Sequence, residues 1–483
     1  MTVQQPEQLE RVRSITSDAS HTLTLVATSL GFVVVQLDVT IVNVALQRIG
    51  DSFGARVAEL QWVVDAYTIA FASLILTAGA LGDRLGVKRI FTSGFFLFTL
   101  ASAACGAAVS MPMLIASRAV QGIGAALLVP CSLAILNHTY RDEASRAKAV
   151  ALWAFGASLA LAAGPVLGGV LVNSIGWRSI FFINLPIGAL GIWLTSRYAA
   201  ESQACRARGL DSGGQITIIL ALGTMAAATI ESSRFGISNP LVIAGFTGFA
   251  LAAGLFVGIE AKGQNPMLPL SFFRNPTFSA AILVGLLINI SYYGLIFLFS
   301  LFFQQAQHYS PFATGLAFLP MTAGVIITNF MAGRITARTG PRLPMLIGQA
   351  LFAAGCLSLV TITPNTAFTY MWWQLLLMGA GIGLVVPPMT SAVLGAIERH
   401  QSGVASGALN ATRQAGSVIG VAVYGALIAD KNQFARGAQI ALYLSAAFLL
   451  FGCLATYRYV ANTSPSRGET AQRGPDYRPV GKE

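Results

Sequence analysis

Four charged residues lie deep inside the long apolar segments of this chain: Asp38, Asp65, Arg118 and Arg413. A charge at mid-bilayer depth costs roughly 2.5–3.5 kcal/mol on insertion scales, so such a residue normally faces a partner, a polar cavity or a substrate path. A carboxylate at this depth can take up and release protons. Two acids and two bases in so apolar a setting therefore predict ion-coupled transport.

The elements that must position these charges are apolar helices. The 483 residues are 55% hydrophobic and 10% charged, whereas a soluble domain carries about 25% charged residues. Because a spanning helix needs about 20 residues and a barrel strand about 10, segment length predicts an all-α integral membrane protein with fourteen spans. The predicted spans are 22–45, 61–82, 88–108, 112–137, 147–173, 178–196, 212–230, 240–259, 277–303, 313–333, 344–363, 366–396, 403–428 and 437–458.

The net charge of +11 is distributed as a topology signal. When loops are assigned alternately to two sides, 22 of the 30 Lys and Arg residues fall on the side of both termini. The positive-inside rule then predicts a multi-pass protein of the plasma or inner membrane with both termini in the cytoplasm. The basic excess is thereby explained without nucleic-acid binding.

Cysteines and histidines show no pattern that would hold a metal or perform catalysis. The five Cys and four His have no paired or ligand spacing. We predict no metal, no cofactor and no enzyme activity, since no Ser/His/Asp or Cys/His arrangement is present either.

A weak internal repeat divides the chain. GDRLGVKRIFTSG (82–94) resembles TARTGPRLPMLIG (336–348), and QGIGAALLVP (121–130) resembles AGIGLVVPPM (380–389). Such repeats are typical of secondary transporters, whose binding sites lie between the halves. The predicted parts are a cytoplasmic tail (1–21), a six-helix bundle (22–196), a linker with two inserted helices (197–276), a second six-helix bundle (277–460) and a disordered tail (461–483).

A basic loop follows the second predicted span. It reads Gly79-Ala-Leu-Gly-Asp83-Arg84-Leu-Gly86-Val-Lys88-Arg89. This string resembles the G-x-L-a-D-r-x-G-r-k loop of the major facilitator superfamily. In that resemblance the glycines allow a tight turn, and Asp83 forms an ion-pair latch with the neighbouring basic residues whose breaking accompanies a change of access. Positive-inside anchoring alone is the alternative.

Asp38 and Arg118 carry the second resemblance. Leu37-Asp38-Val-Thr40-Ile-Val-Asn43 resembles the first-helix signature of the fourteen-helix drug:proton antiporters, and Arg118-Ala-Val-Gln121-Gly122 resembles the R-x-x-Q-G element of the superfamily. Burial favours the protonated form of a carboxylic acid. Asp38 is therefore the predicted proton carrier, which Arg118 would tune. A purely structural ion pair is the alternative.

Substrate contacts are predicted on three helices. Asp65 and Trp62 share a helix face, and an acid beside an aromatic ring would attract a lipophilic cation. A solvated Asp65 near the helix start is the alternative. The thirteenth span carries a polar stripe that includes Asn410 and Arg413, which should face the central cavity, although a helix-packing role is also open. Gln121 completes the predicted substrate set.

The fifth span contains a packing motif. Gly164-Pro165-Val-Leu-Gly168-Gly169 resembles the G-P-x-x-G-G motif of the antiporters. Small residues let helices approach closely, and proline removes a backbone hydrogen bond and bends the helix. These four residues are predicted to act in conformational gating.

The resemblance covers about residues 22–460. It implies a monomeric major facilitator transporter in the lipid bilayer that exports amphipathic drugs or toxic compounds, cationic or aromatic, in exchange for protons. Multidrug efflux and antibiotic resistance would follow. The alternative is a dedicated exporter of one metabolite, such as a self-made antibiotic or siderophore. A nutrient symporter is disfavoured by the Gly164-Pro165 motif.

Overall fold

The computed structural model describes residues 5–140, 142–201, 211–263, 266–398, 401–430 and 433–461, and all regular structure in these ranges is helical. The predicted tail 461–483 lies outside the described residues from position 462 onward, and so does part of the predicted linker, 202–210.

The first half of the chain forms a bundle around α4. Its helices are α1 (Gln5–Phe53), α2 (Val57–Leu85), α3 (Val87–Gly106), α4 (Met111–Thr139), α5 (Glu143–Ser174), α6 (Ser179–Phe182) and α7 (Asn184–Tyr198). α2 and α3 both pack on α4, and α5 and α7 pack on α1. Close packing depends on small residues, since a Cβ on Gly124 of α4 would stand 2.7 Å from the Phe98 nitrogen of α3.

Helix α1 is longer than the sequence predicts. The segment predicted as a tail, 1–21, is helical from Gln5 onward and continues into the first span. Residues 7–13 are good helix formers for most of their length, and Pro6 lies in the first turn, where its missing N–H costs nothing.

The second half repeats the bundle after a helical hairpin. The hairpin is α8 (Ser212–Phe235) and α9 (Pro240–Lys262); the bundle is α10 (Pro276–Leu301), α11 (Pro311–Ala317), α12 (Leu319–Thr339), α13 (Arg342–Ser358), α14 (Trp372–Gly395), α15 (Ser402–Leu427) and α16 (Phe434–Tyr459). Short 3₁₀ turns occupy Leu270–Arg274 and Phe368–Tyr370, and a π-helical turn, Phe302–Ala306, continues α10. Residues predicted as the start of the twelfth span, 366–371, therefore lie before α14.

Twelve helices in the described ranges are long and apolar enough to cross a membrane. α13 is apolar but has only 17 residues, and α15 has 26 residues but lies outside these twelve. α15 is the helix with the predicted polar stripe, which lowers its hydropathy. Each of the fourteen predicted segments coincides with a helix, but the count of fourteen spans is not established by apolarity.

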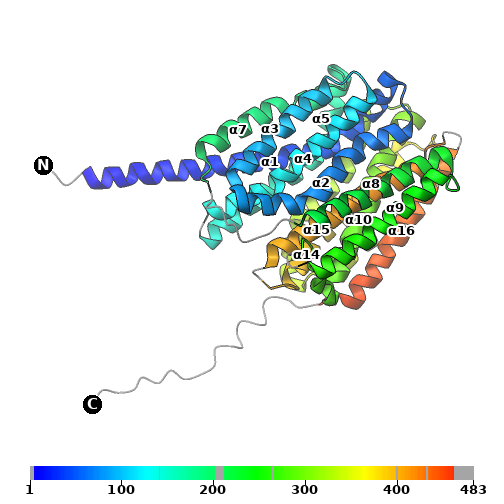
Figure 1. Ribbon diagram of the computed structural model, residues 1–483. Helices are drawn as coiled ribbons and strands as arrows, with labels where there is room; N and C mark the ends of the chain where they lie inside the picture. Colours follow the sequence, from blue (N-terminus) through cyan, green and yellow to red (C-terminus); the bar gives the residue numbers. More distant parts are fainter. Residues whose placement is uncertain are drawn as a thin grey trace, which may run out of the picture.

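The hairpin α8–α9 lies where the two halves meet (Figure 1). α8 packs against α2 of the first half and α15 of the second. Gln215 of α8 donates to the Ser73 carbonyl of α2 at 2.9 Å and also bonds the Thr77 hydroxyl. α9 packs on α8 and is otherwise largely exposed, which suits a lipid-facing helix.

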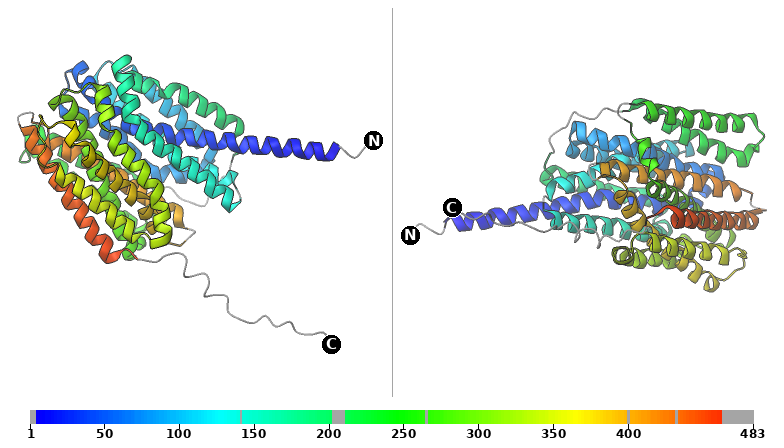
Figure 2. Two further views of the ribbon diagram at one scale, coloured as in Figure 1. Left: turned by 180° about the vertical axis from the view of Figure 1, so that it is seen from behind. Right: turned by 90° about the horizontal axis from the view of Figure 1, so that it is seen from below.

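The two ends of the molecule differ. The start of α1 and the end of α16 lie at the same end, which we call the termini end; the opposite end is the far end (Figures 1 and 2). In Figure 2 the first turns of α1 project well beyond the bundles at the termini end.

Candidate functional site

A cavity of about 920 Å³ lies between the two halves. Its walls come from the termini-end portions of α2, α4, α5, α14 and α15 together with the middle of α10, so it opens toward the termini end. The lining includes an aromatic pair that the sequence analysis missed, Phe32 of α1 and Trp153 of α5, whose rings stack at 4.2 Å between centroids. Periodicity alone could not distinguish these rings from ordinary core residues.

The far end is closed by direct contacts between the halves. The Ser300 hydroxyl of α10 bonds the Asn43 carbonyl of α1, and Gln305 donates to the Gln47 side chain at 2.6 Å. Gln61 of α2 donates to two backbone carbonyls of α15, at 3.0 and 2.8 Å. The cavity is thus accessible from one end only.

The Gly-Pro motif of α5 lies in this closed region. A Cβ on Gly168 would stand 2.9 Å from Ile41 of α1, and one on Gly169 would stand 2.7 Å from the Pro311 carbonyl oxygen of α11. Gly164 packs against Thr40, and the Pro165 carbonyl packs against Gly315 of α11. The motif therefore holds α5 against α1 within its own half and against α11 of the other half.

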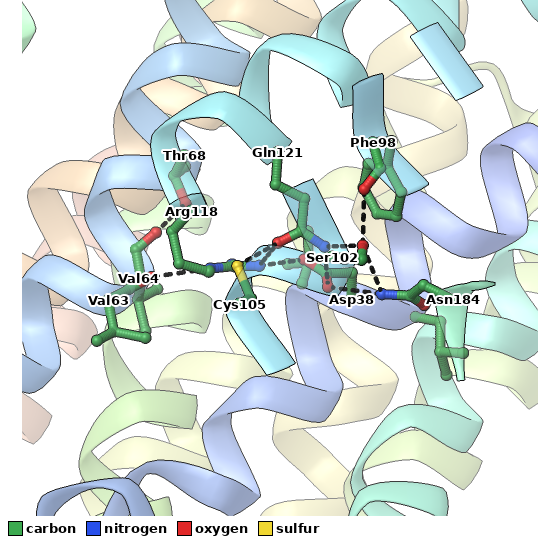
Figure 3. A network of polar contacts seen from close by, with 12 residues as sticks. Asp38, Val63, Val64, Thr68, Phe98, Ser102, Cys105, Arg118, Gln121 and Asn184 are labelled. Carbon is green, nitrogen blue, oxygen red and sulfur yellow. Dashed lines mark hydrogen bonds and ion pairs between the residues drawn. The ribbon is translucent and has the colours of Figure 1, made fainter. Parts of the chain in front are cut away.

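Asp38 is held by three side chains in the core of the first half (Figure 3). Its Oδ2 accepts a hydrogen bond from Arg118 Nη1 at 2.5 Å, and its Oδ1 accepts from Gln121 at 2.8 Å and Asn184 at 3.2 Å. Asp38 and Arg118 are 0% and 1% exposed in their side chains. The structure thus brings Asp38 and its predicted partner Arg118 into direct contact.

Arg118 has further partners besides Asp38, and together these side chains form the Asp38–Arg118 cluster. Its Nε donates to the Val63 carbonyl at 3.0 Å, its Nη1 also donates to Gln121 Oε1 at 2.7 Å, and its guanidinium carbon lies 4.3 Å from the Tyr67 ring centroid. Ser102 accepts from Gln121 at 2.8 Å. Gln121, predicted to bind substrate, is fully buried here and does not line the cavity.

Ser102 and Asn184 are cluster members that were not predicted as site residues. Asn184 is the first residue of α7, and a polar residue in an otherwise apolar span was the available signal. Ser102 carried no signal, because a serine in a spanning helix commonly bonds its own backbone, as Ser102 does with Phe98 at 2.8 Å.

Asp65 has a different environment. It is 0% exposed, and neither of its carboxyl oxygens has a hydrogen-bond partner. α2 begins at Val57, two turns earlier, so the alternative of a solvated residue at a helix start is wrong. Trp62 packs against a buried cluster that includes Leu222 and Ala226 of α8. Neither Asp65 nor Trp62 lines the cavity.

The polar stripe of α15 reaches the cavity. Ser406, Asn410 and Arg413 line it, whereas Ser417 is buried beyond it. Arg413 Nε is buried and has no hydrogen-bond partner. It interacts electrostatically with Tyr293 of α10, which also lines the cavity.

The basic segment predicted as a loop is helical except at Gly86, the one residue between α2 and α3. Its partner also differs from the predicted one. Asp83 lines the mouth of the cavity and takes part in neither of the ion pairs that the described residues form. Instead Glu201, after α7, pairs with Arg89 at 3.6 Å and accepts from the Lys88 backbone N–H at 3.2 Å.

Gly86 permits this contact. Its φ of +100° favours glycine, and a Cβ there would stand 2.6 Å from Glu201. The predicted latch of Asp83 with its basic neighbours is therefore not formed in this conformation. Gly79 lines the cavity beside Pro130, and Arg84 lies one turn from it at the end of α2.

The sequence is similar to a known protein family and to resistance proteins within it. Residues 28–421 match the Major Facilitator Superfamily. The chain is 36% identical to the methylenomycin A resistance protein of Streptomyces coelicolor over 454 residues, 94% of this chain and 95% of that protein. It is 38% identical to the multidrug resistance protein Stp of Mycobacterium tuberculosis, over 84% of this chain and 76% of that protein.

Among solved structures, the fold resembles a bacterial homologue of the human lysosomal transporter Spinster in an inward-facing and unoccupied conformation. The TM-score is 0.62 with 16% sequence identity, covering 91% of this chain and 98% of the other.

Proposed function

Because the chain belongs to the major facilitator superfamily, whose members among its relatives confer drug and antibiotic resistance, we propose that it exports amphipathic drugs or toxic compounds in exchange for protons by alternating access. The observation that carries this proposal is the cavity between the halves, open at the termini end and closed at the far end. Its aromatic wall of Phe32 and Trp153 suits apolar, aromatic compounds.

The proposed topology has fourteen spans. In this topology α13 and α15 also cross the membrane, in addition to the twelve strongly apolar helices. The fourteen spans then form two six-helix bundles, 22–196 and 277–460, with the hairpin between them in 197–276. With both termini in the cytoplasm of a cell carrying this protein in its plasma or inner membrane, the open cavity faces inward. The monomer encloses the whole cavity, so we propose that it acts alone.

Switching between the two access states would exchange the contacts at the two ends. Opening the far end would separate α5 from α11, where Gly169 and Gly315 now allow close approach. Closing the termini end would bring Asp83, near the end of α2, toward the opposite half. We propose gating roles for the loop residues Gly79, Asp83, Arg84, Gly86 and Lys88 and for the α5 motif Gly164, Pro165, Gly168 and Gly169.

Proton coupling is proposed for the two buried acids of the first half. Asp38 accepts a hydrogen bond from Arg118 at 2.5 Å, and proton transfer to this carboxyl group would release that charge-assisted bond. Asp65 has no donor or cation to stabilise a charge, so it holds a proton in this conformation. The predicted role of Asp65 and Trp62 in binding a cation lacks support in this state, since neither lines the cavity.

A dedicated exporter is the second candidate. The methylenomycin A resistance protein, related over nearly the full length of both chains, is named for a single antibiotic. A resistance screen separates the two candidates, because a specialist protects cells against one compound class only.

The deciding experiment is efflux in inverted membrane vesicles. Vesicles containing the protein should accumulate a fluorescent drug when a proton gradient is imposed and lose it when an uncoupler collapses the gradient. The Asp38→Asn variant should accumulate at least tenfold less. Full proton-driven accumulation by that variant would refute the role of Asp38, and accumulation that ignores the uncoupler would refute proton exchange.

A further inference from the structure

Arg413 provides a fixed positive charge at the inner end of the cavity. From it we infer that the transported compounds carry a carboxylate or a similar anionic group on an apolar body, which the Arg413 guanidinium binds. This inference rests on the proposed export function and specifies its substrate class.

The guanidinium of Arg413 has unused donors. A guanidinium carries five N–H groups and no acceptor. Arg413 Nε is buried without a partner, and the two ion pairs of the described residues, Arg118–Asp38 and Arg89–Glu201, leave Arg413 out. A buried cation of this kind is costly unless something pairs with it. In a transporter cavity the transported compound can do so.

Arg413 is also the innermost lining residue of α15. The cavity-lining residues of this helix run from Gly403 to Arg413, away from the mouth. The acids that line the cavity, Asp83 and Asp211, lie near helix ends instead: Asp83 is close to the end of α2, and Asp211 caps the start of α8. The deep part of the cavity, as the described residues line it, is therefore electropositive, which disfavours a cationic substrate there.

Groups around Arg413 can complete an anion site. Tyr292 and Tyr293 of α10 line the same region, with rings 5.2 Å apart and nearly perpendicular. Asn289, one turn away on α10, and Asn410, one turn away on α15, also line the cavity. Phenol hydroxyls and amide N–H groups are donors that an oxyanion accepts from, so all four side chains are compatible with a carboxylate.

Other lining residues supply the apolar surface of the site. Phe32 and Trp153 stack on the wall formed by the first half of the chain, and Ile382 and Val386 of α14 line the wall formed by the second half. A planar guanidinium binds a carboxylate through two parallel hydrogen bonds, whereas the ammonium of lysine binds as a point charge. The site thus selects an aromatic or aliphatic acid over the corresponding ester or amine.

The test uses three matched probes: 1-naphthaleneacetate, its methyl ester, and (1-naphthylmethyl)trimethylammonium. Binding to the purified full-length protein at pH 7 is measured by titration calorimetry. We expect the carboxylate to bind at least tenfold more tightly than the ester, because charge-assisted hydrogen bonds contribute about 10- to 100-fold in affinity. The quaternary amine should bind no better than the ester.

Variants assign the effect to Arg413. Arg413→Gln should weaken binding of the carboxylate at least tenfold and change binding of the ester less than about twofold. Arg413→Lys should give an intermediate loss. Arg436→Gln, which removes an exposed arginine near the start of α16, is the matched control and should match the unaltered protein.

Three results would overturn the inference: no preference for the carboxylate over the ester, tighter binding of the amine, or equal weakening of all three probes by Arg413→Gln. Failure of the export function is distinguishable. Carboxylate binding that depends on Arg413, without gradient-driven movement in proteoliposomes, would leave the anion site standing and refute transport. Gradient-driven transport of the ester but not of the carboxylate would support transport and refute the anion site.

Discussion

Asp38 and Asp65 lie on adjacent helices of the same half, both fully buried, yet their surroundings are opposite. Asp38 accepts from Arg118, Gln121 and Asn184, whereas both oxygens of Asp65 lack any donor. Burial alone therefore does not define what an acid does. A carboxylate surrounded by donors is prepared to be charged, and one without donors is prepared to hold a proton.

The two arginines inside the spans, Arg118 buried and Arg413 half-buried, repeat the contrast. Arg118 donates to the Val63 carbonyl, Gln121 and Asp38, whereas Arg413 faces the cavity with Nε unpaired. The first half holds its charges in a closed network, and the second half presents one to whatever occupies the cavity. Measurements on variants can test this division, and the expected effects fall in a clear order.

The largest effect is expected for Arg118→Gln. Removing one partner of a buried ion pair leaves the other charge uncompensated and costs about 3–5 kcal/mol. The apparent Tm of the purified variant, measured by intrinsic fluorescence, should fall sharply. The double variant Asp38→Asn/Arg118→Gln should recover most of the loss in stability without recovering transport. Equal stability of the single and double variants would show that the pair is not a closed network.

Asn substitutions at the two acids should separate stability from coupling. Asp38→Asn removes the counter-ion of Arg118 but leaves it the Val63 carbonyl and Gln121 as acceptors, so it should cost about 1.5–3 kcal/mol, the range for a hydrogen bond to a charged group. Asp65→Asn replaces a neutral acid by a neutral amide and should change stability by less than about 1 kcal/mol, while reducing proton-driven efflux at least tenfold. A large destabilisation by Asp65→Asn would mean that Asp65 has a structural partner.

The effect of Arg413→Gln on stability should have the opposite sign to that of Arg118→Gln. Because an unpaired charge is removed from a half-buried position, the free energy of unfolding should stay the same or rise by about 1 kcal/mol. Thermal unfolding in detergent measures it, with Arg436→Gln as the control for loss of a single charge. A fall of several kcal/mol would place Arg413 in a network like that of Arg118.

The smallest effect is expected for the exposed ion pair between Glu201 and Arg89. Glu201 pairs with Arg89 at 3.6 Å, and the two side chains are 37% and 77% exposed. Exposed pairs contribute about 0–1 kcal/mol, so Glu201→Gln should barely change Tm in 150 mM salt. A drop comparable to that of Asp38→Asn would show that this linker contact is as important as the buried pair.

Much of the fold was predictable because apolar length determines where helices form. Each predicted span coincides with a helix or with two consecutive helices, and α8 and α9 follow α7 and precede α10 in chain order. Boundaries were less predictable. The polar residues before position 22 continue α1, since good helix formers without a stop signal extend a helix past the apolar region.

The site was predictable in its residue types and less so in its partners. Motif resemblance linked Asp38 to Arg118, and their contact followed. The position of Gln121, one turn from Arg118, was compatible with either the cavity or the core, and only the packing of α4 against α1 and α3 decides it. The pairing of Glu201 with Arg89 could not be predicted from the sequence, because only the fold brings this linker residue beside the start of α3.

The start of helix α1 extends beyond the bundles at the termini end. It begins at Gln5 and is 49 residues long, and its predicted apolar span begins at position 22, so about 17 residues precede the span. At 1.5 Å per residue, this extension is about 25 Å long. If the first half rotates by about 15° between states, the tip moves by about 7 Å. A fluorophore pair with one dye at the tip would then convert each access cycle into an optical signal.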